Sequence, residues 1–200
     1  MTETAHRHHD HLSATRQILW VVLIINAAMF AIEIFAGLHA GSIALQADAL
    51  DFLGDAATYA ITLALLAAPI RWRAAAAFAK AASLGVFGIW ILSSAVVNGL
   101  SPIAPAAQIM GGVGLAALLA NVVSAILLFH FRDGDANLRS VWLCSRNDAL
   151  GNVAVIAAAG GVFATTTAWP DIAVGSVMAA LSLSAALQIA RHAWQEWHSA

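Results

Sequence analysis

The chain has 200 residues, of which 61% are hydrophobic and only 10% charged, with a mean hydropathy of +0.81. A soluble domain carries about 25% charged residues, so this chain has too few to cover a surface that faces water. The 9 Lys and Arg against 11 Asp and Glu give a formal charge of −2, which excludes a basic surface for nucleic acid. The single cysteine, Cys144, excludes an internal disulfide framework and a CxxC site. An integral membrane protein is the class that remains.

Six apolar stretches are long enough to cross a bilayer, which takes roughly 20 mainly apolar residues per helix. They lie at residues 18–38, 43–68, 74–100, 107–131, 141–165 and 171–191, and Gly, Pro and polar residues separate them. The sequence therefore predicts an all-α, polytopic membrane protein with six transmembrane helices. This domain would cover residues 18–191, between a His-rich tail of residues 1–17 and a short tail of residues 192–200.

Positive charges alternate between the loops. Arg7 and Arg16 precede the first stretch, and Arg191 is the last residue of the sixth. Lys and Arg also flank the second and fourth loops, where Arg71, Arg73 and Lys80 belong to the second. The first, third and fifth loops contain none. Because positively charged loops stay in the cytoplasm, we expect both termini there. Residues 1–17 lack the apolar core of a signal peptide, so the first span is expected to remain as an anchor.

Five carboxylates lie inside the apolar stretches: Glu33, Asp48, Asp51, Asp55 and Asp148. An Asp near the bilayer centre costs about 3 kcal/mol on insertion scales. A single such acid is explained as readily by an interhelical hydrogen bond or an interface position as by function. Three aspartates in one span are much harder to explain in that way.

The spacing of these acids favours a cation site. At about 100° per residue, Asp48, Asp51 and Asp55 fall within about 60° of one another around a helix. Asp51 and Asp55 are one turn apart, so both carboxylates can point at the same atom. Unpaired, they repel, and in a medium of low dielectric at least one takes up a proton. A divalent cation would neutralise both.

The fifth stretch offers a matching pair, because Cys144 and Asp148 are also one turn apart. Together with Asp51 and Asp55 they make a set of three oxygens and one sulfur, which suits tetrahedral zinc or cobalt if the helices face each other. Two interpretations of Cys144 stay open. It is either a metal ligand or a small buried apolar residue, which is the commoner use of a lone cysteine.

Other polar residues are candidates for a secondary or entrance site. They are the intramembrane acids Asp48 and Glu33 and the tail histidines His6, His8, His9 and His11. The histidines could collect Zn²⁺, Co²⁺ or Ni²⁺ near the entrance, or belong to a solvated tail without a site. Arg146 lies about 160° around the helix from Asp148, so we expect it to reach the interface or to pair with Glu33 or Asp135.

Two segments, GSIALQADALDFLGD (41–55) and SVWLCSRNDALGNVAVIAAA (140–159), resemble the cation diffusion facilitator family. The resemblance covers nearly all of the six spans and implies a proton-coupled exporter of divalent metals with cytoplasmic termini. It assigns the metal site to Asp51, Asp55, Cys144 and Asp148, with Cys144 where the family has His or Asp. Members typically continue into a cytoplasmic domain that dimerises, and the sequence ends at Ala200 before one.

The resulting hypothesis is a divalent metal efflux transporter of a bacterial inner membrane, working by metal/proton antiport and alternating access. Its expected partners are divalent metal ions, most simply Zn²⁺ or Co²⁺, protons, the lipid bilayer and a second copy in a homodimer. Neither enzyme activity nor a resident cofactor is expected, since the metal is cargo. The alternative is a membrane metal sensor or assembly partner of the same fold that does not transport.

Overall fold

The computed structural model describes the backbone of residues 2–65, 69–129 and 136–199. Side chains are described from residue 16 onward within these ranges, except at 70, 136–141, 143, 144 and 199. The described chain forms six helices and no strand: α1 (Thr2–Ala40), α2 (Ile43–Leu65), α3 (Ile70–Leu100), α4 (Ala107–Leu128), α5 (Ala136–Thr165) and α6 (Trp169–Ser199). The predicted all-α class and the number of helices are confirmed.

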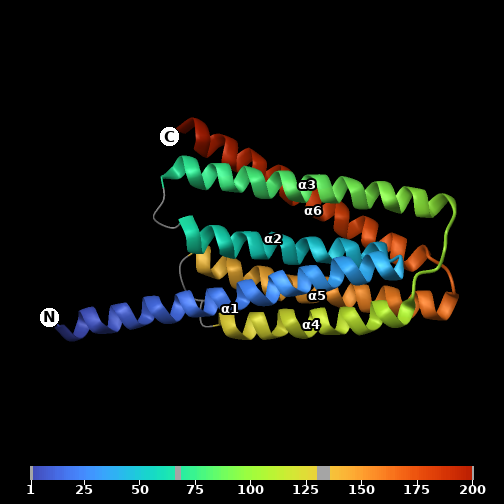
Figure 1. The fold of residues 1–200 in the computed structure, drawn as a ribbon, viewed down its shortest axis with the longest axis horizontal. Helices are drawn as coiled ribbons and strands as arrows, with labels where there is room; N and C mark the ends of the chain where they lie inside the picture. Colours follow the sequence, from blue (N-terminus) through green and yellow to red (C-terminus); the bar gives the residue numbers. More distant parts are fainter. Residues whose placement is uncertain (1, 66–68, 130–135, 200) are drawn as a thin grey trace.

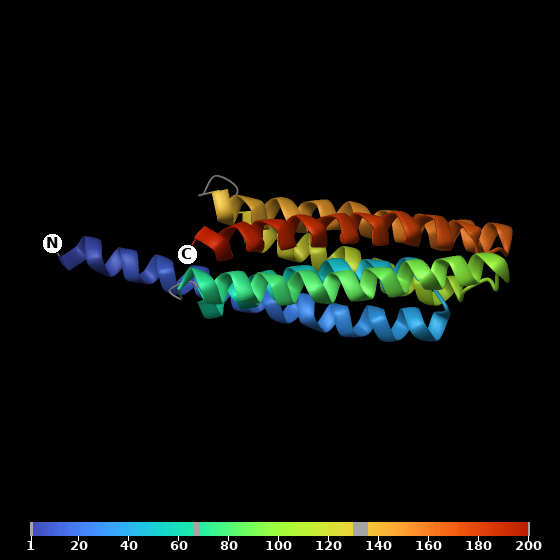
Figure 2. The ribbon, with the colours of Figure 1, turned by 90° about the horizontal axis from the view of Figure 1, so that it is seen from above.

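Consecutive helices run antiparallel, so both termini lie at one end of the bundle (Figure 1), which we call the terminal end. The opposite end holds the turns at Gly41 and Thr166 and is called the far end. In the view from above, α5 and α6 form one layer and α2 and α3 lie in the layer beside it (Figure 2). α2 contacts each of the other five helices, whereas α3 contacts only α2 and α6 in the described part. α2 is therefore the centre of the bundle.

Five helices contain segments long and apolar enough to cross a membrane, and α2 is the exception. Its 23 residues include three aspartates, which are more charges than the most apolar segment of any of the other five helices contains. Residues 43–50 of α2 are nevertheless all buried, because other helices surround this half on every side. Five of the predicted spans thus follow from their own composition, and α2 is sheltered by its neighbours.

The terminal helices are longer than the predicted spans. α1 begins at Thr2 and α6 continues to Ser199, so both predicted tails are helical in the described backbone. The tail sequences contain no Gly or Pro, and nothing local ends the helix. α2 is described to Leu65, and the rest of its predicted span, residues 66–68, falls outside the described residues.

At the far end, α6 caps α2 across the bundle. One carboxylate oxygen of Asp171 accepts hydrogen bonds from Ser42 Oγ at 2.6 Å and from the Ala44 N–H at 3.0 Å, and the other accepts from the Ile43 N–H at 2.8 Å. These are donors that the first turn of a helix leaves unpaired. Gly175 packs beside them, where a Cβ would stand 2.6 Å from the Ile43 carbonyl carbon. The two helices are therefore held together backbone to backbone.

Candidate metal site

A cavity of about 820 Å³ lies between α2, α3, α5 and α6. Its wall is mainly apolar, with leucines such as Leu50, Leu84 and Leu181. The polar and charged side chains on the wall are Asp51, Asp55, Lys80, Asn147, Asp148 and Ser182. We call this cavity the acidic pocket, because three of the five carboxylates that the sequence singled out line it.

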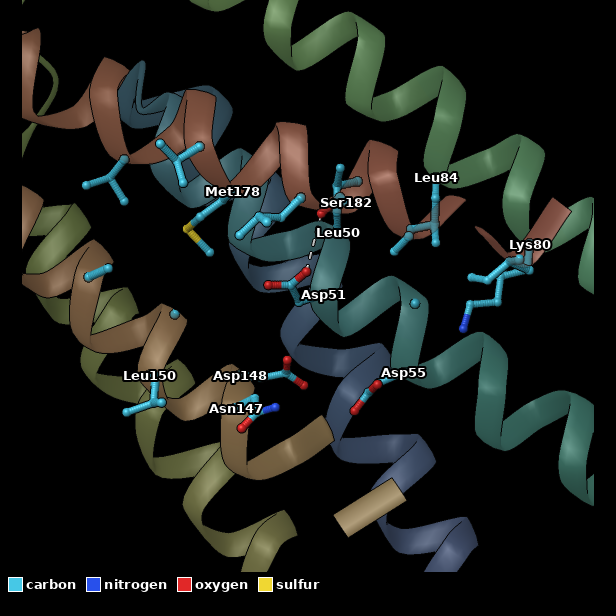
Figure 3. Close-up of a pocket in the computed structure, with 18 of the residues that line it drawn as sticks. Leu50, Asp51, Asp55, Lys80, Leu84, Asn147, Asp148, Leu150, Met178 and Ser182 are labelled. Carbon is cyan, nitrogen blue, oxygen red and sulfur yellow. Dashed lines mark hydrogen bonds between the residues drawn. The ribbon is translucent and has the colours of Figure 1, made fainter. Parts of the chain in front are cut away.

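The three aspartates come from the two helices that the sequence paired. Asp148 points from α5 toward α2, and Asp55 points back toward it (Figure 3). The carboxyl groups of Asp55 and Asp148 face each other closely enough to interact. Asp51 lies one turn along α2 and accepts a long hydrogen bond of 3.4 Å from Ser182 Oγ of α6. Two carboxyls this close require either a shared proton or a cation between them.

The described side chains do not form a finished metal cage. Among them, no group of three or more His, Cys, Asp or Glu is close enough to hold an ion. The side chain of Cys144 falls outside the described residues, so the predicted fourth ligand is not placed. Its backbone lies in α5, one turn before Asp148. The ligand set Asp51, Asp55, Asp148 and Cys144 thus stays a prediction, and binding would require Asp51 to approach the Asp55–Asp148 pair.

Asp55 is hydrogen-bonded by the phenol of Tyr59, which in turn contacts the hydroxyl of Ser145. Tyr59 Oη donates a hydrogen bond of 3.1 Å to Asp55 Oδ2. The Tyr59 Oη atom also lies 3.3 Å from Ser145 Oγ of α5. Both side chains are buried. Sequence reasoning missed them, although the spacing of four residues between Asp55 and Tyr59 places them on one face of α2.

Lys80 also lines the acidic pocket, whereas the sequence analysis assigned it to the flank of the second loop. It is ten residues into α3, and its Nζ donates a hydrogen bond to Thr58 Oγ1 of α2. The long side chain brings a positive charge to the same wall as the three aspartates. The position of Lys80 inside the predicted span 74–100, rather than in the loop before it, could have identified it as a residue of the pocket.

Asp48 and Glu33 lie outside the acidic pocket. Asp48 Oδ2 accepts 2.7 Å from Asn152 Nδ2, and Asn152 Oδ1 accepts 2.9 Å from Asn121 Nδ2. Glu33 is fully buried and its carboxyl is within hydrogen-bonding reach of Asp48. No described donor reaches either Glu33 oxygen or Asp48 Oδ1, so a proton between the two carboxyls would satisfy them. We call Glu33, Asp48, Asn152 and Asn121 the buried polar chain, which joins α1, α2, α5 and α4.

The side chain of Arg146 lies away from the acidic pocket, as its helical position predicted. It is exposed, its guanidinium stands 5.3 Å from the centre of the Trp142 ring, and Nη2 donates to Asn147 Oδ1 at 3.2 Å. The predicted pairing with Glu33 is wrong, because Glu33 is buried with no hydrogen-bond donor in the described part. Asp135, the other candidate, falls outside the described residues, as do the side chains of His6, His8, His9 and His11.

Comparison with known proteins fits this arrangement. Residues 19–196 match the model of the cation efflux transmembrane domain. The chain belongs to the cation efflux family. It is 33% identical over 183 residues to the zinc transporter ZitB of Pectobacterium atrosepticum, covering 84% of this chain and 56% of that protein.

Two further relatives extend the comparison. The ZitB of Escherichia coli is 31% identical over 209 residues, covering 94% of this chain and 64% of the relative. The metal cation efflux system protein CzcD of Cupriavidus metallidurans is 30% identical over 179 residues, covering 83% and 56%. The chain thus spans 56 to 64% of the length of these relatives. What it shares with the family is a multi-pass transmembrane domain.

Proposed function

We propose that this cation efflux protein exports a divalent transition metal, zinc or cobalt foremost, in exchange for protons. The observation that supports it is the convergence of Asp51 and Asp55 of α2 with Asp148 of α5 on one pocket inside a bundle of membrane helices. Placing ionisable acids inside a membrane costs free energy, and such residues commonly mark the pathway or binding site of an ion. The names of the relatives, a zinc transporter and a metal cation efflux system protein, support the class of cargo.

The chemistry of the cargo follows from the donors. Three carboxylates offer hard oxygen ligands, and Lys80 offsets part of their charge. Cys144, one helical turn from Asp148, would complete a tetrahedral site and favour zinc, cobalt or cadmium. If Cys144 only packs against its neighbours, an all-oxygen site would suit manganese or iron(II) better.

Proton exchange requires no separate device. A carboxylate holds either a proton or the metal, so metal binding releases protons, and protons that arrive from the other side displace the metal. The close Asp55–Asp148 pair supports this exchange, because it needs a positive occupant in every state. Alternating access would come from rocking of the α2–α5 pair against the remaining helices.

The surroundings of the transporter follow from the loop charges and the relatives. The alternation of Lys and Arg between loops supports cytoplasmic termini at the terminal end. The bacterial relatives support an inner-membrane location. In this orientation metal would enter from the terminal end and leave at the far end. A homodimer would be held together by the spans or by chain beyond the residues described.

The experiment that tests the proposal uses the purified chain in proteoliposomes loaded with a zinc-sensitive dye and a pH dye. Asp148→Asn removes one charge with almost no change of shape, so zinc flux and zinc-dependent proton flux should fall to the level of empty vesicles. Gln188→Ala, an exposed change on α6, serves as the control and should transport normally. Undiminished flux through Asp148→Asn would refute the proposal. Zinc binding by the wild type without any flux would instead assign the chain as a metal sensor.

A further inference from the structure

Tyr59 is placed between the two helices that carry the predicted metal ligands. Its hydroxyl lies 3.1 Å from Asp55 Oδ2 on its own helix and 3.3 Å from Ser145 Oγ on α5. Tyr59 is 1% exposed and Ser145 is fully buried, so this contact is sealed from solvent. Tyr59 does not line the acidic pocket, and its hydrogen bond to Asp55 connects it to the pocket wall.

The direction of the hydrogen bonds follows from the donors available. A phenol has one proton, and an ionised carboxylate only accepts. The arrangement that satisfies all three groups has Ser145 donating to Tyr59 and Tyr59 donating to Asp55. With Tyr59 turned to donate to Ser145 instead, Asp55 Oδ2 would lose this bond in a buried setting, which is costly. A hydroxyl on α5 thus supports a carboxylate on α2 through the phenol.

The aromatic ring is held rigidly enough to act as a support. It packs in an apolar cluster with Leu19 and Val22 of α1 and Leu128 of α4. All of these side chains are buried, so the ring has no space in which to change rotamer. The position of the hydroxyl, and with it the orientation of Asp55, is therefore set by packing from α1 and α4.

We propose that Tyr59, together with Ser145, is a positioning residue that sets the metal affinity of the acidic pocket. It holds Oδ2 of Asp55 and so directs the carboxylate toward Asp148. In this role Tyr59 would act on the metal through its hydrogen bond to Asp55 rather than as a ligand. The inference rests on the proposed function, because it takes Asp55 to be a metal ligand.

The first test is Tyr59→Phe, which keeps the ring and its packing and removes only the hydroxyl. Loss of a hydrogen bond to a charged group predicts a zinc dissociation constant about tenfold higher, measured by titration calorimetry on the detergent-solubilised chain. In proteoliposomes the half-saturation concentration should rise by a similar factor while the maximal rate stays close to that of the wild type. A structural defect would instead lower the maximal rate and the unfolding temperature. Ser93→Ala, whose exposed hydroxyl bonds only its own helix, is the matched control.

The second test uses Ser145, which keeps the proposal falsifiable if Tyr59→Phe folds poorly. Ser145→Ala should weaken zinc binding by about threefold, whereas Ser145→Thr, which retains a hydroxyl, should restore it. The double variant Tyr59→Phe/Ser145→Ala should be no weaker than Tyr59→Phe alone, because both act through one chain of hydrogen bonds.

The outcomes separate this inference from the proposed function. A wild type that neither binds nor transports a divalent metal overturns both. A wild type that binds zinc, with unchanged affinity in Tyr59→Phe, overturns only the role of Tyr59. Equal effects of Ser145→Ala and Ser145→Thr would also overturn it, because the loss would then come from packing rather than from the hydroxyl.

Discussion

Asp48 and Asp51 are three residues apart on α2, yet they lie in different surroundings. Asp48 is sealed in the bundle and receives a short hydrogen bond from the Asn152 amide. Asp51 lines the acidic pocket and has only a long hydrogen bond from Ser182. The same side chain on one helix is therefore sealed in a short hydrogen bond in one case and faces a cavity with only a long hydrogen bond in the other.

The contrast extends to the two regions as a whole. In the buried polar chain, amide groups of Asn152 and Asn121 link acids to a fixed network across four helices. In the acidic pocket, Asp55 faces Asp148, another acid, across a cavity. Facing carboxyls occur in both regions, Glu33 with Asp48 and Asp55 with Asp148, and each pair is stabilised by a proton or a cation between its members. What differs is access, because the Asp55–Asp148 pair opens onto the acidic pocket, whereas the Glu33–Asp48 pair is sealed inside the bundle.

The largest expected effect comes from a matched pair of substitutions, Asp51→Ala and Asp48→Ala. Asp51→Ala should lose zinc flux and keep its unfolding temperature, because it removes a predicted ligand and only the long hydrogen bond from Ser182. Asp48→Ala should lower the unfolding temperature by roughly 5 °C, because it strands the buried Asn152 donor. Thermal unfolding followed by intrinsic fluorescence, beside vesicle flux, measures both. Identical profiles for the two variants would erase the distinction between the regions.

A smaller effect is expected at Cys144, which tests whether α5 contributes sulfur to the acidic pocket. Cys144→Ser replaces a soft ligand by a hard one, so cadmium flux should fall about tenfold relative to manganese flux. Parallel metal-by-metal flux assays of wild type and variant measure the ratio. An unchanged ratio would mean that Cys144 packs as an apolar residue and that the pocket binds metal through oxygen alone.

The smallest effect is expected outside the bundle. Deletion of residues 2–12 removes His6, His8, His9 and His11, so half-saturation for zinc should rise by about twofold to threefold without change in maximal rate. Replacement of the four histidines by Gln in the full-length chain controls for loss of the helix itself. Complete loss of transport in that replacement would show that the tail does more than collect metal.

The sequence predicted the helices well because hydropathy and turn residues are local properties. It also brought Asp51 and Asp55 together with Asp148, because a spacing of one turn and the cost of intramembrane charge are local as well. Angular position on the helix alone could not separate Asp48 from Asp51, since the two fall within about 60° of each other. The one-turn spacing to Asp55 and the family resemblance together assigned Asp51 to the predicted metal site and Asp48 to a secondary one. Their distinguishing partners, Asn152 and Ser182, come from α5 and α6, about a hundred residues or more along the chain.

The support of Asp55 and the position of Lys80 were missed for a related reason. From the sequence, Tyr59 is indistinguishable from an ordinary aromatic core residue, and only the structure shows its contact with Ser145 of α5. From the sequence, Lys80 was assigned to the positive charges of a loop, and only the structure shows that its side chain reaches Thr58 inside the bundle. Long and amphipathic side chains place their polar ends far from their Cα atoms, and the sequence does not say in which direction.

The cap that Asp171 places on α2 limits how the protein can change shape. Separating α2 from α6 at that end would strand the Ser42 hydroxyl and the Ile43 and Ala44 amides away from any acceptor. Opening of the acidic pocket toward the terminal end would leave this contact intact, whereas the proposed release of metal at the far end would have to break it. Amide hydrogen exchange should accordingly be slowest at Ile43 and Ala44 and grow faster along α2 toward Leu65.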